Sequence, residues 1–269
     1  MDSIRADVAL VSRGLASSRE RAQSLIHAGL VKLNGAALEK PSVKVSESDI
    51  LAVAGSDCPY VSRGGLKLEK ALDAFSVSPD GQICMDVGAS TGGFTDVLLR
   101  RGAELVYAID VGSGQLVPEI AENPRVVSME HTNARALERE MFAPVPTLAV
   151  MDVSFISIKL ILPALKRVMG ADGRLVALIK PQFEAGPAAL GKKGVVTSAR
   201  VHERVLAEIA AFAPNAGWQL RALDFSPIAG GSGNLEFLGD FLSIERCEAL
   251  PPDEKAVRAL VDRAHRMIK

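Results

Sequence analysis

The amino-acid sequence predicts an α/β fold with a mostly parallel sheet, preceded by a small α+β module. From Lys67 onward, apolar segments of strand length alternate with helical stretches, whereas the first sixty residues follow a shorter and different pattern. Strands separated by helices are typical of a parallel sheet with helices on both faces. A length of 269 residues suits one large domain with a small appendage. We therefore expect domains at residues 1–59 and 60–269.

The small module is predicted to contain one helix and several short strands. A serine cap precedes apolar positions at helical spacing over residues 18–29, and a glycine ends the pattern. Residues 31–33 and 43–53 are typical of short strands, and the Asn-Gly pair at 34–35 is a strong hairpin signal. A proline and small polar residues at 56–59 predict a linker.

Six apolar segments are predicted as strands of the large domain. They are Ile83–Val87, Leu105–Ile109, Arg125–Met129, Leu148–Val153, Arg174–Ile179 and Trp218–Phe225. Ligands of such sheets bind at the carboxyl ends of the strands, so polar residues that directly follow a strand are candidate site residues. The apolar stretch 145–165 contains Asp152 and Lys159, and we expect a strand and a helix there instead of a membrane span.

A glycine-rich loop at residues 88–93 follows the first of these strands, and its glycines allow a close approach of backbone to ligand. Asp86 would repel the pyrophosphate of a dinucleotide, whereas a carboxylate favours the sulfonium and ammonium of S-adenosyl-L-methionine. Asp110 ends the next strand, where it can accept hydrogen bonds from ribose hydroxyls. Glu130 and Asn133 could frame the adenine. The alternative is that these acids only cap helices or loops.

The segment 152–155, Asp-Val-Ser-Phe, follows the fourth strand and bears on the methyl acceptor. Enzymes that methylate exocyclic base nitrogens typically place an Asn/Asp-Pro-Pro-aromatic run there, so amine methylation is disfavoured. Methylation of pyrimidine C5 needs a nucleophilic cysteine near this edge, and none of the three cysteines is placed there. A ribose hydroxyl is a poor acid, and a lysine with a lowered pKa would suit its activation. Lys180 and Lys67 are candidates, with an ordinary solvated lysine as the alternative for each.

Taken together, Lys67, Asp152, Lys180 and Glu236 match in order and local context the Lys-Asp-Lys-Glu tetrad of the FtsJ-like ribose 2′-O-methyltransferases. More narrowly, the chain resembles the TlyA family, described both as hemolysins and as ribosomal RNA 2′-O-methyltransferases. This likeness covers nearly the full length and rests on the segments SRGGLKL, DVGASTGGFTD, DVSFIS, KPQFEAG and GNLEF. Thr91 stands where the wider FtsJ-like group often has proline. The first sixty residues resemble an S4 RNA-binding domain.

The resemblance implies a Rossmann-like methyltransferase domain after an S4-like domain, with S-adenosyl-L-methionine as cofactor and no metal. The implied reaction is methylation of ribose 2′-hydroxyls, with cytidine as the expected nucleoside, in ribosomal RNA or ribosomal subunits. Lys180 would activate the hydroxyl, and Lys67, Asp152 and Glu236 would orient it. The residues expected around the cofactor are Asp86, Gly88, Ala89, Ser90, Gly92, Gly93, Asp110, Val111, Asn133 and Asp152.

Basic side chains of an S4-like module are expected to contact RNA phosphates. The candidates are Arg5, Arg13, Arg19, Arg21 and Lys32. A solvated helix face is the alternative, because residues 1–60 carry seven basic and seven acidic side chains. The segment 191–194, followed by Arg200, His202 and Arg204, could close over the RNA strand, or be a flexible surface loop.

Composition limits the remaining classes. A net charge of −1 gives no overall basic coat, and three cysteines without paired spacing predict neither disulfides nor a zinc site. The first residues lack the apolar stretch of a signal peptide, so we expect a cytoplasmic protein without a membrane partner. The alternatives are a membrane-active protein, as the hemolysin name suggests, and a catalytically silent RNA-binding protein. The oligomeric state is not predicted.

Overall fold

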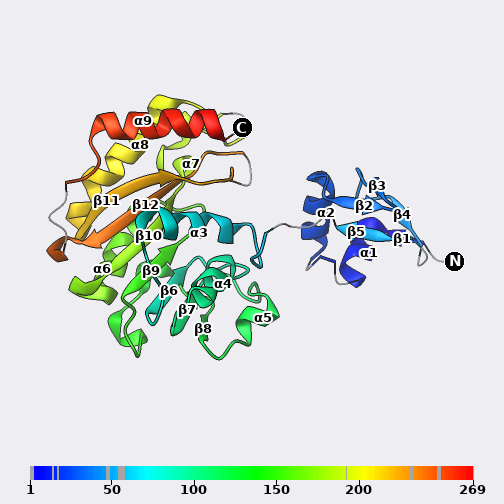
Figure 1. The fold of residues 1–269 in the computed structure, drawn as a ribbon, viewed down its shortest axis with the longest axis horizontal. Coiled ribbons are helices and arrows are strands. Elements are labelled where there is room, and N and C mark those ends of the chain that lie inside the picture. Colours follow the sequence, from blue (N-terminus) through cyan, green and yellow to red (C-terminus); the bar gives the residue numbers. More distant parts are fainter. Residues whose placement is uncertain are drawn as a thin grey trace. The chain divides into compact units, whose positions relative to one another are not determined.

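The computed structural model describes residues 3–13, 15–16, 18–46, 49–53, 58–191, 193–230, 233–246 and 250–268. The chain divides into two compact units, Met1–Pro59 and Tyr60–Lys269, which are described separately below (Figure 1). Part of the predicted linker, residues 56 and 57, lies outside the described residues, as does Lys192 of the predicted basic segment.

The first unit packs two helices against two small antiparallel sheets. Its elements are β1 (Ile4–Arg5), α1 (Ala6–Ser12), α2 (Arg19–His27), β2 (Val31–Leu33), β3 (Ala36–Ala37), β4 (Lys44–Val45) and β5 (Leu51–Val53). Helix α2 is the predicted helix, and the Ser18 side chain caps it by accepting a hydrogen bond from Arg21 N at 3.1 Å. Helix α1 was not predicted, because no side chain caps its start at Ala6.

A seven-stranded sheet forms the centre of the second unit, in the order β11-β12-β10-β9-β6-β7-β8. Its strands are β6 (Ile83–Val87), β7 (Leu105–Ile109), β8 (Val126–Met129), β9 (Leu148–Met151), β10 (Arg174–Ile179), β11 (Trp218–Phe225) and β12 (Phe237–Ser243). The five strands from β10 to β8 are parallel, and β12 pairs antiparallel with both β10 and β11. The mostly parallel sheet is confirmed. Strand β12 was missed, because Gly239 and Asp240 interrupt its apolar pattern.

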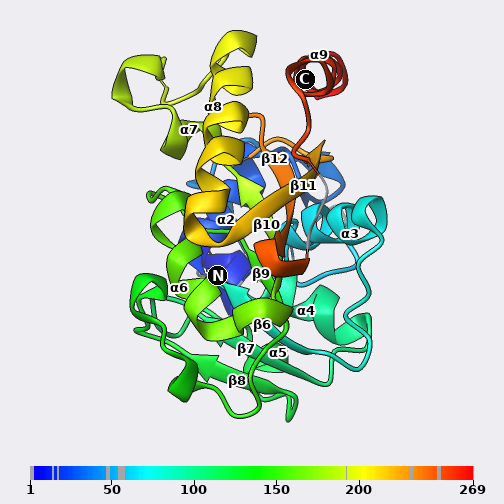
Figure 2. The same ribbon diagram turned by 90° about the vertical axis from the view of Figure 1, so that its left-hand side faces the viewer.

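Helices cover both faces of this sheet (Figure 2). They are α3 (Gly64–Phe75), α4 (Gly93–Arg100), α5 (Pro118–Ala121), α6 (Leu162–Met169), α7 (Pro181–Glu184), α8 (Ala199–Phe212) and α9 (Glu254–Met267). Side chains alternate between the faces along each strand. In β6, Met85 and Val87 pack in the cluster that contains α6, α8 and α9, whereas Cys84 packs with α3 and α4. Within the described ranges, no helix is long and apolar enough to cross a membrane.

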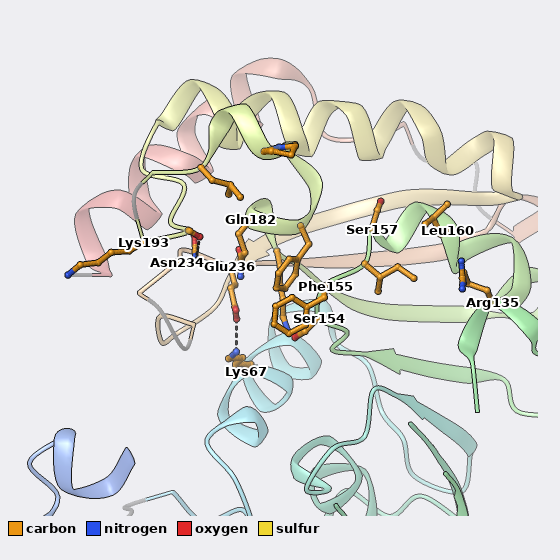
Figure 3. A pocket seen from close by; sticks show the side chains of 17 residues that line it. Lys67, Arg135, Ser154, Phe155, Ser157, Leu160, Gln182, Lys193, Asn234 and Glu236 are labelled. Atoms are coloured by element: carbon orange, nitrogen blue, oxygen red, sulfur yellow. Dashed lines mark hydrogen bonds and ion pairs between the residues drawn. The ribbon is translucent and has the colours of Figure 1, made fainter. Parts of the chain in front are cut away.

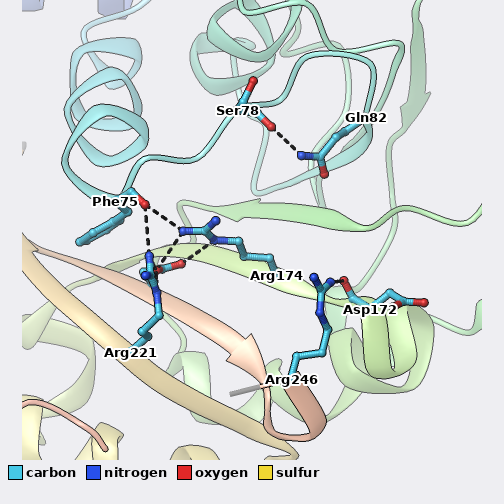
Figure 4. A network of polar contacts seen from close by, with 8 residues as sticks. Phe75, Ser78, Gln82, Asp172, Arg174, Arg221 and Arg246 are labelled. Atoms are coloured by element: carbon cyan, nitrogen blue, oxygen red, sulfur yellow. Dashed lines mark hydrogen bonds and ion pairs between the residues drawn. The ribbon is translucent and has the colours of Figure 1, made fainter. Parts of the chain in front are cut away.

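Short 3-10 turns lie at Ala134–Ala136, Arg139–Met141, Ile158–Leu160, Gly170–Asp172, Pro187–Ala189, Ala213–Ala216 and Ile244–Arg246. At the amino end of β10, a polar network joins the sheet to the end of α3 (Figure 4). The buried carboxylate of Asp240 accepts hydrogen bonds from Arg174 at 3.0 Å and Arg221 at 2.6 Å. The two guanidinium groups thus compensate the buried negative charge of Asp240. Both also donate to Phe75 O, at the end of α3. This network lies at the amino edge, opposite the carboxyl edge at which ligands of parallel sheets bind.

Candidate active site

Neighbouring strands deliver several predicted site residues to the carboxyl edge of the sheet. Gly88, Asp152 and Lys180 each follow directly on β6, β9 and β10, respectively, which lie side by side in the sheet. Glu236 directly precedes β12, whose first residue pairs with Ile179 at the end of β10. Because β12 runs antiparallel to β10, its start lies at the edge where β10 ends. The sheet topology thus brings together residues that are up to 148 positions apart, from 88 to 236.

Two lysine–carboxylate pairs form at this edge. Lys180 Nζ lies 2.6 Å from Asp152 Oδ1, an ion pair without hydrogen-bond alignment, and donates to Ser154 Oγ at 2.9 Å. Lys67 Nζ, from α3, lies 2.5 Å from Glu236 Oε2. The two lysine side chains are only 10% and 11% exposed. The two lysines and two carboxylates of the tetrad therefore balance in charge, in a site with little exposure to solvent.

Two cavities meet at these pairs. A cavity of about 260 Å³ lies against the glycine-rich loop, and a larger one of about 1080 Å³ extends toward α7 (Figure 3). Lys67, Ser154 and Lys180 line both cavities, whereas Asp152 lines only the smaller and Glu236 only the larger. A group bound in one cavity can therefore reach a group bound in the other across the two lysines. This arrangement suits transfer of a small group between two ligands.

The glycine-rich loop shapes the smaller cavity. Gly88 has a φ of +85°, and a Cβ there would lie 2.6 Å from Asp152 O, so only glycine fits. The loop is tied to the next strand, since Ser90 N donates to Asp110 Oδ2 at 2.8 Å. Asp110 Oδ1 accepts a second backbone hydrogen bond from Gly112 N at 2.8 Å. Val111 follows Asp110, with 70% of its surface exposed. The loop is thus a backbone cradle that is tied to the Asp110 carboxylate.

Asp86 lies fully buried behind this loop. Its Oδ2 accepts a hydrogen bond from Thr95 Oγ1 at 2.7 Å, and its Oδ1 accepts none from the described residues. Burial, followed by the charges of Asp152 and Asp110, raises the pKa of Asp86 to about 7. Three carboxylates thus gather around the loop. These carboxyl groups fit a positively charged ligand such as S-adenosyl-L-methionine, which carries a sulfonium and an ammonium group.

Asn133, the last residue expected around the cofactor, is exposed and caps a 3-10 turn by accepting from Arg135 N at 3.1 Å. Glu130 Oε1 accepts from Gly114 N at 2.6 Å. Both side chains therefore shape the loops that follow β7 and β8. Ala89 is buried, whereas Ser90 is exposed.

The basic residues of the first unit lie in different surroundings. Arg5 and Arg19 both donate to Asp7, a carboxylate with no exposed surface. The Arg5 guanidinium, more than any other group, holds the pKa of Asp7 well below its usual range. Arg13 instead donates to two backbone carbonyls, Asp49 O at 2.6 Å and Ser46 O at 2.8 Å, and so braces the fold. The side chains of Arg21 and Lys32 are exposed.

Comparison with known proteins places the chain in a family. The FtsJ-like methyltransferase family matches residues 60–239, and the S4 domain matches residues 4–51. YqxC of Bacillus subtilis is 45% identical over 98% of this chain and 95% of its own length. The 16S/23S rRNA (cytidine-2′-O)-methyltransferase TlyA of Mycobacterium tuberculosis is 43% identical over 98% of this chain and 97% of its own. The chain belongs to the TlyA family.

Membership of the TlyA family confirms the predicted methyltransferase class, the use of S-adenosyl-L-methionine and the S4-like domain. A solved structure from Streptococcus thermophilus that carries the name hemolysin superposes with a TM-score of 0.80. It is 45% identical and covers 99% of this chain and 97% of that one. Both names used for the TlyA family are thus found among its relatives.

Sequence reasoning missed several residues of this candidate site. Ser154 lines both cavities, and Thr95 holds Asp86, yet neither was singled out. Phe155 is 90% exposed on a backbone with φ +63°, and its ring centroid lies 5.1 Å from that of Phe183. The sequence did offer a signal for Phe155, since an aromatic residue directly after the Asp-Val-Ser run at the end of a strand is a candidate to contact a ligand.

One residue of the basic segment after α7 contradicts its predicted role. Lys193 lines the larger cavity. His202 was wrong as an RNA contact, because it is fully buried in α8 with Nδ1 2.9 Å from His265 Nε2. The helical period places it on the inner face of α8, whereas Arg200 and Arg204 are exposed.

Proposed function

We propose that this chain transfers the methyl group of S-adenosyl-L-methionine to the 2′-hydroxyl of a cytidine in ribosomal RNA. The observation that carries the proposal is the pair of lysine–carboxylate contacts at the junction of the two cavities. A hydroxyl has no lone pair as nucleophilic as that of an amine, so its proton must leave during transfer. The name of the Mycobacterium tuberculosis relative supports cytidine and ribosomal RNA as the acceptor.

The reaction requires the ribose 2′-oxygen to lie in line with the methyl group and its sulfur. The bound cofactor supplies the methyl group as a sulfonium. Lys67, Ser154 and Lys180 line both cavities and would hold the 2′-oxygen between them. We assign Lys180 Nζ, after its own ammonium proton has left, to accept the hydroxyl proton while the new O–C bond would form and the methyl–sulfur bond would break. Asp152 orients this nitrogen and Glu236 orients Lys67, so each lysine keeps one position.

We assign the smaller cavity to the cofactor. Gly88, Ala89, Ser90, Gly92 and Gly93 would form its backbone cradle. Asp86 and Asp152 would balance positive charge. Asp110 retains lone pairs for the ribose hydroxyls, and Val111 and Asn133 would flank the adenine.

The larger cavity suits the acceptor nucleotide. The exposed ring of Phe155 and the adjacent ring of Phe183 offer an aromatic surface to a base that has left its stack. Stacking of a base on an aromatic side chain is worth about 1 to 3 kcal/mol. Lys193 and Arg135, which also line the cavity, suit phosphate groups on either side of that nucleotide.

We propose that residues 1–59 bind ribosomal RNA and that residues 60–269 methylate it, in the cytoplasm where ribosomal subunits assemble. Arg5, Arg19, Arg21 and Lys32 would contact phosphates, because their side chains reach solvent. Arg13 would act through the fold, since two carbonyls occupy its guanidinium. Binding that depends on phosphates should weaken steeply as salt rises.

Transfer of labelled methyl groups to ribosomal RNA from cells that lack the protein tests this function. Lys180→Met should lower the rate by about 10²- to 10⁴-fold, because general-base catalysis contributes on that scale. Its affinity for S-adenosyl-L-methionine, measured by calorimetry, should stay within about threefold of the original. Lys159→Met is the matched control, since Lys159 pairs with Glu208 outside both cavities.

Retained turnover in Lys180→Met would show that the base is misassigned. Absence of cofactor binding in the unaltered chain would sink the enzyme proposal and favour a silent RNA-binding protein. Lysis of vesicles without methyl transfer would favour the membrane-active alternative.

A further inference from the structure

Gln182 occupies a position that the proposed reaction does not use. It lies two residues after Lys180, in the short helix α7, and its side chain lines the larger cavity. Figure 3 shows it above the Lys67–Glu236 pair, on the same side of the cavity as Asn234. Lys180 and Gln182 line the same cavity, so one ligand bound there can contact both side chains.

The amide oxygen of Gln182 is buried and accepts no hydrogen bond from the described residues. Nearly all buried polar atoms of proteins have a hydrogen-bond partner, so an exception in a cavity wall points to a ligand that supplies one. A donor on the ligand must fill this role, because the atom is an acceptor.

Two polar side chains near Gln182, Asn234 in the cavity wall and Glu184 in α7, are already engaged. Asn234 Oδ1 accepts from Val196 N at 2.9 Å, and its Nδ2 donates to Gly194 O at 3.2 Å. Glu184, also in α7, accepts from Ser157 Oγ at 2.6 Å and from Ile158 N at 2.8 Å. The contacts of Glu184 fix α7 against the 154–158 segment, and so they hold Gln182 in place before a ligand arrives.

We infer that Gln182 recognises the base of the acceptor nucleotide by accepting a hydrogen bond from the exocyclic amino group of cytosine. A glutamine amide carries an acceptor and a donor side by side, and the cytosine edge presents the amino donor beside the ring-nitrogen acceptor. The inference rests on the proposed function, since it takes the 2′-hydroxyl to lie at Lys180. Gln182 is thus a specificity-determining residue.

A substrate analogue isolates this contact. The probe is the ribosomal RNA fragment that contains the methylated cytidine, compared with the same fragment carrying 2-pyrimidinone, which lacks the amino group, at that position. For the unaltered chain, kcat/KM should fall by about 10- to 100-fold on the analogue, as expected when a buried acceptor stays unpaired. Gln182→Leu, of similar volume, should lose about as much on cytidine and nothing further on the analogue.

The failure modes are separate. If the unaltered chain methylates cytidine and 2-pyrimidinone equally well, or if Gln182→Leu still discriminates between them, the inference is overturned while the proposed function stands. If the unaltered chain methylates neither fragment at a ribose, both fail. A purely structural role for Gln182 would lower both rates together, and unchanged cofactor affinity and thermal stability of Gln182→Leu would exclude misfolding.

Discussion

Replacing Asp86 with asparagine should stabilise this protein at alkaline pH and leave it almost unchanged at acidic pH. The carboxyl group is fully buried, and its pKa is about 7 against an ordinary value of 3.8. Between these two pH values the folded chain holds a proton that the unfolded chain has lost. The free energy of unfolding therefore falls as pH rises from about 4 to 7, and then levels off.

The size of the effect follows from the shift. A rise of about three pKa units, at about 1.4 kcal/mol per unit, costs the folded state at most about 4 kcal/mol above pH 7. Asparagine removes this cost but replaces a charge-assisted hydrogen bond from Thr95 with a neutral one, a loss of about 1 kcal/mol. We expect Asp86→Asn to gain about 1 to 3 kcal/mol at pH 8 and about none at pH 4.

Urea unfolding followed by circular dichroism between pH 4 and pH 8 measures this difference. Asp240→Asn is the control, because that buried carboxylate is paired with Arg174 and Arg221, and its loss should destabilise the fold by about 2 to 4 kcal/mol. A constant difference between Asp86→Asn and the unaltered chain across this pH range would refute the reasoning. The asparagine should also weaken cofactor binding, if the carboxylate balances the charge of the cofactor.

Three further predictions concern the loop, the first unit and α8. Gly88→Ala should abolish cofactor binding, measured by calorimetry, and should lower the free energy of unfolding by about 2 to 4 kcal/mol. Gly114 is the control, because it also has a positive φ, +62°, but open space around it. Gly114→Ala should lower the free energy of unfolding by only about 1 kcal/mol. Arg13→Ala should lower the stability of the first unit by about 1 to 3 kcal/mol, because it removes two hydrogen bonds to backbone carbonyls. Arg21→Ala should leave that stability unchanged and weaken RNA binding. The reverse pattern in thermal melts and filter binding would contradict these assignments. Burial, with a smaller effect of the neighbouring histidine, lowers the pKa of His202 from 6.5 to about 4. The folded chain therefore keeps its full stability above pH 6.5 and loses stability as pH falls toward 4, because only the unfolded chain takes up the proton there. Over that range the free energy of unfolding of the unaltered chain should fall by up to about 3 kcal/mol more than that of His202→Leu, and parallel losses would show that His202 does not titrate.

The sequence was most informative where a residue directly follows a parallel strand. Asp110, Asp152 and Lys180 could be placed at one edge because the strands before them are continuous apolar runs. Glu236 was different, since the strand that positions it was missed and only its motif identified it. The contact between Lys67 and Glu236 depends on how α3 crosses the sheet, which no local pattern encodes.

Features that depend on several neighbours at once were out of reach. His202 looked like a surface base in a basic run, but the register of α8 turns it into the core. That Gln182 Oε1 accepts no hydrogen bond from the described residues is visible only after the nearby donors have been located. Helix α1 has no capping side chain, and so its start carried no signal. Chemical class could thus be predicted from the strand ends, whereas the roles of single side chains required packing.

The position of the transferred methyl group tests the central claim most directly. Ribosomal RNA from cells that lack the protein would be incubated with the purified chain and deuterated S-adenosyl-L-methionine, digested to nucleosides and analysed by mass spectrometry. We predict deuterated methyl groups on the ribose of 2′-O-methylcytidine, and about 10²- to 10⁴-fold slower labelling of that ribose with Lys180→Met. Deuterated methyl groups on a base, or none on RNA despite cofactor binding, would contradict the account.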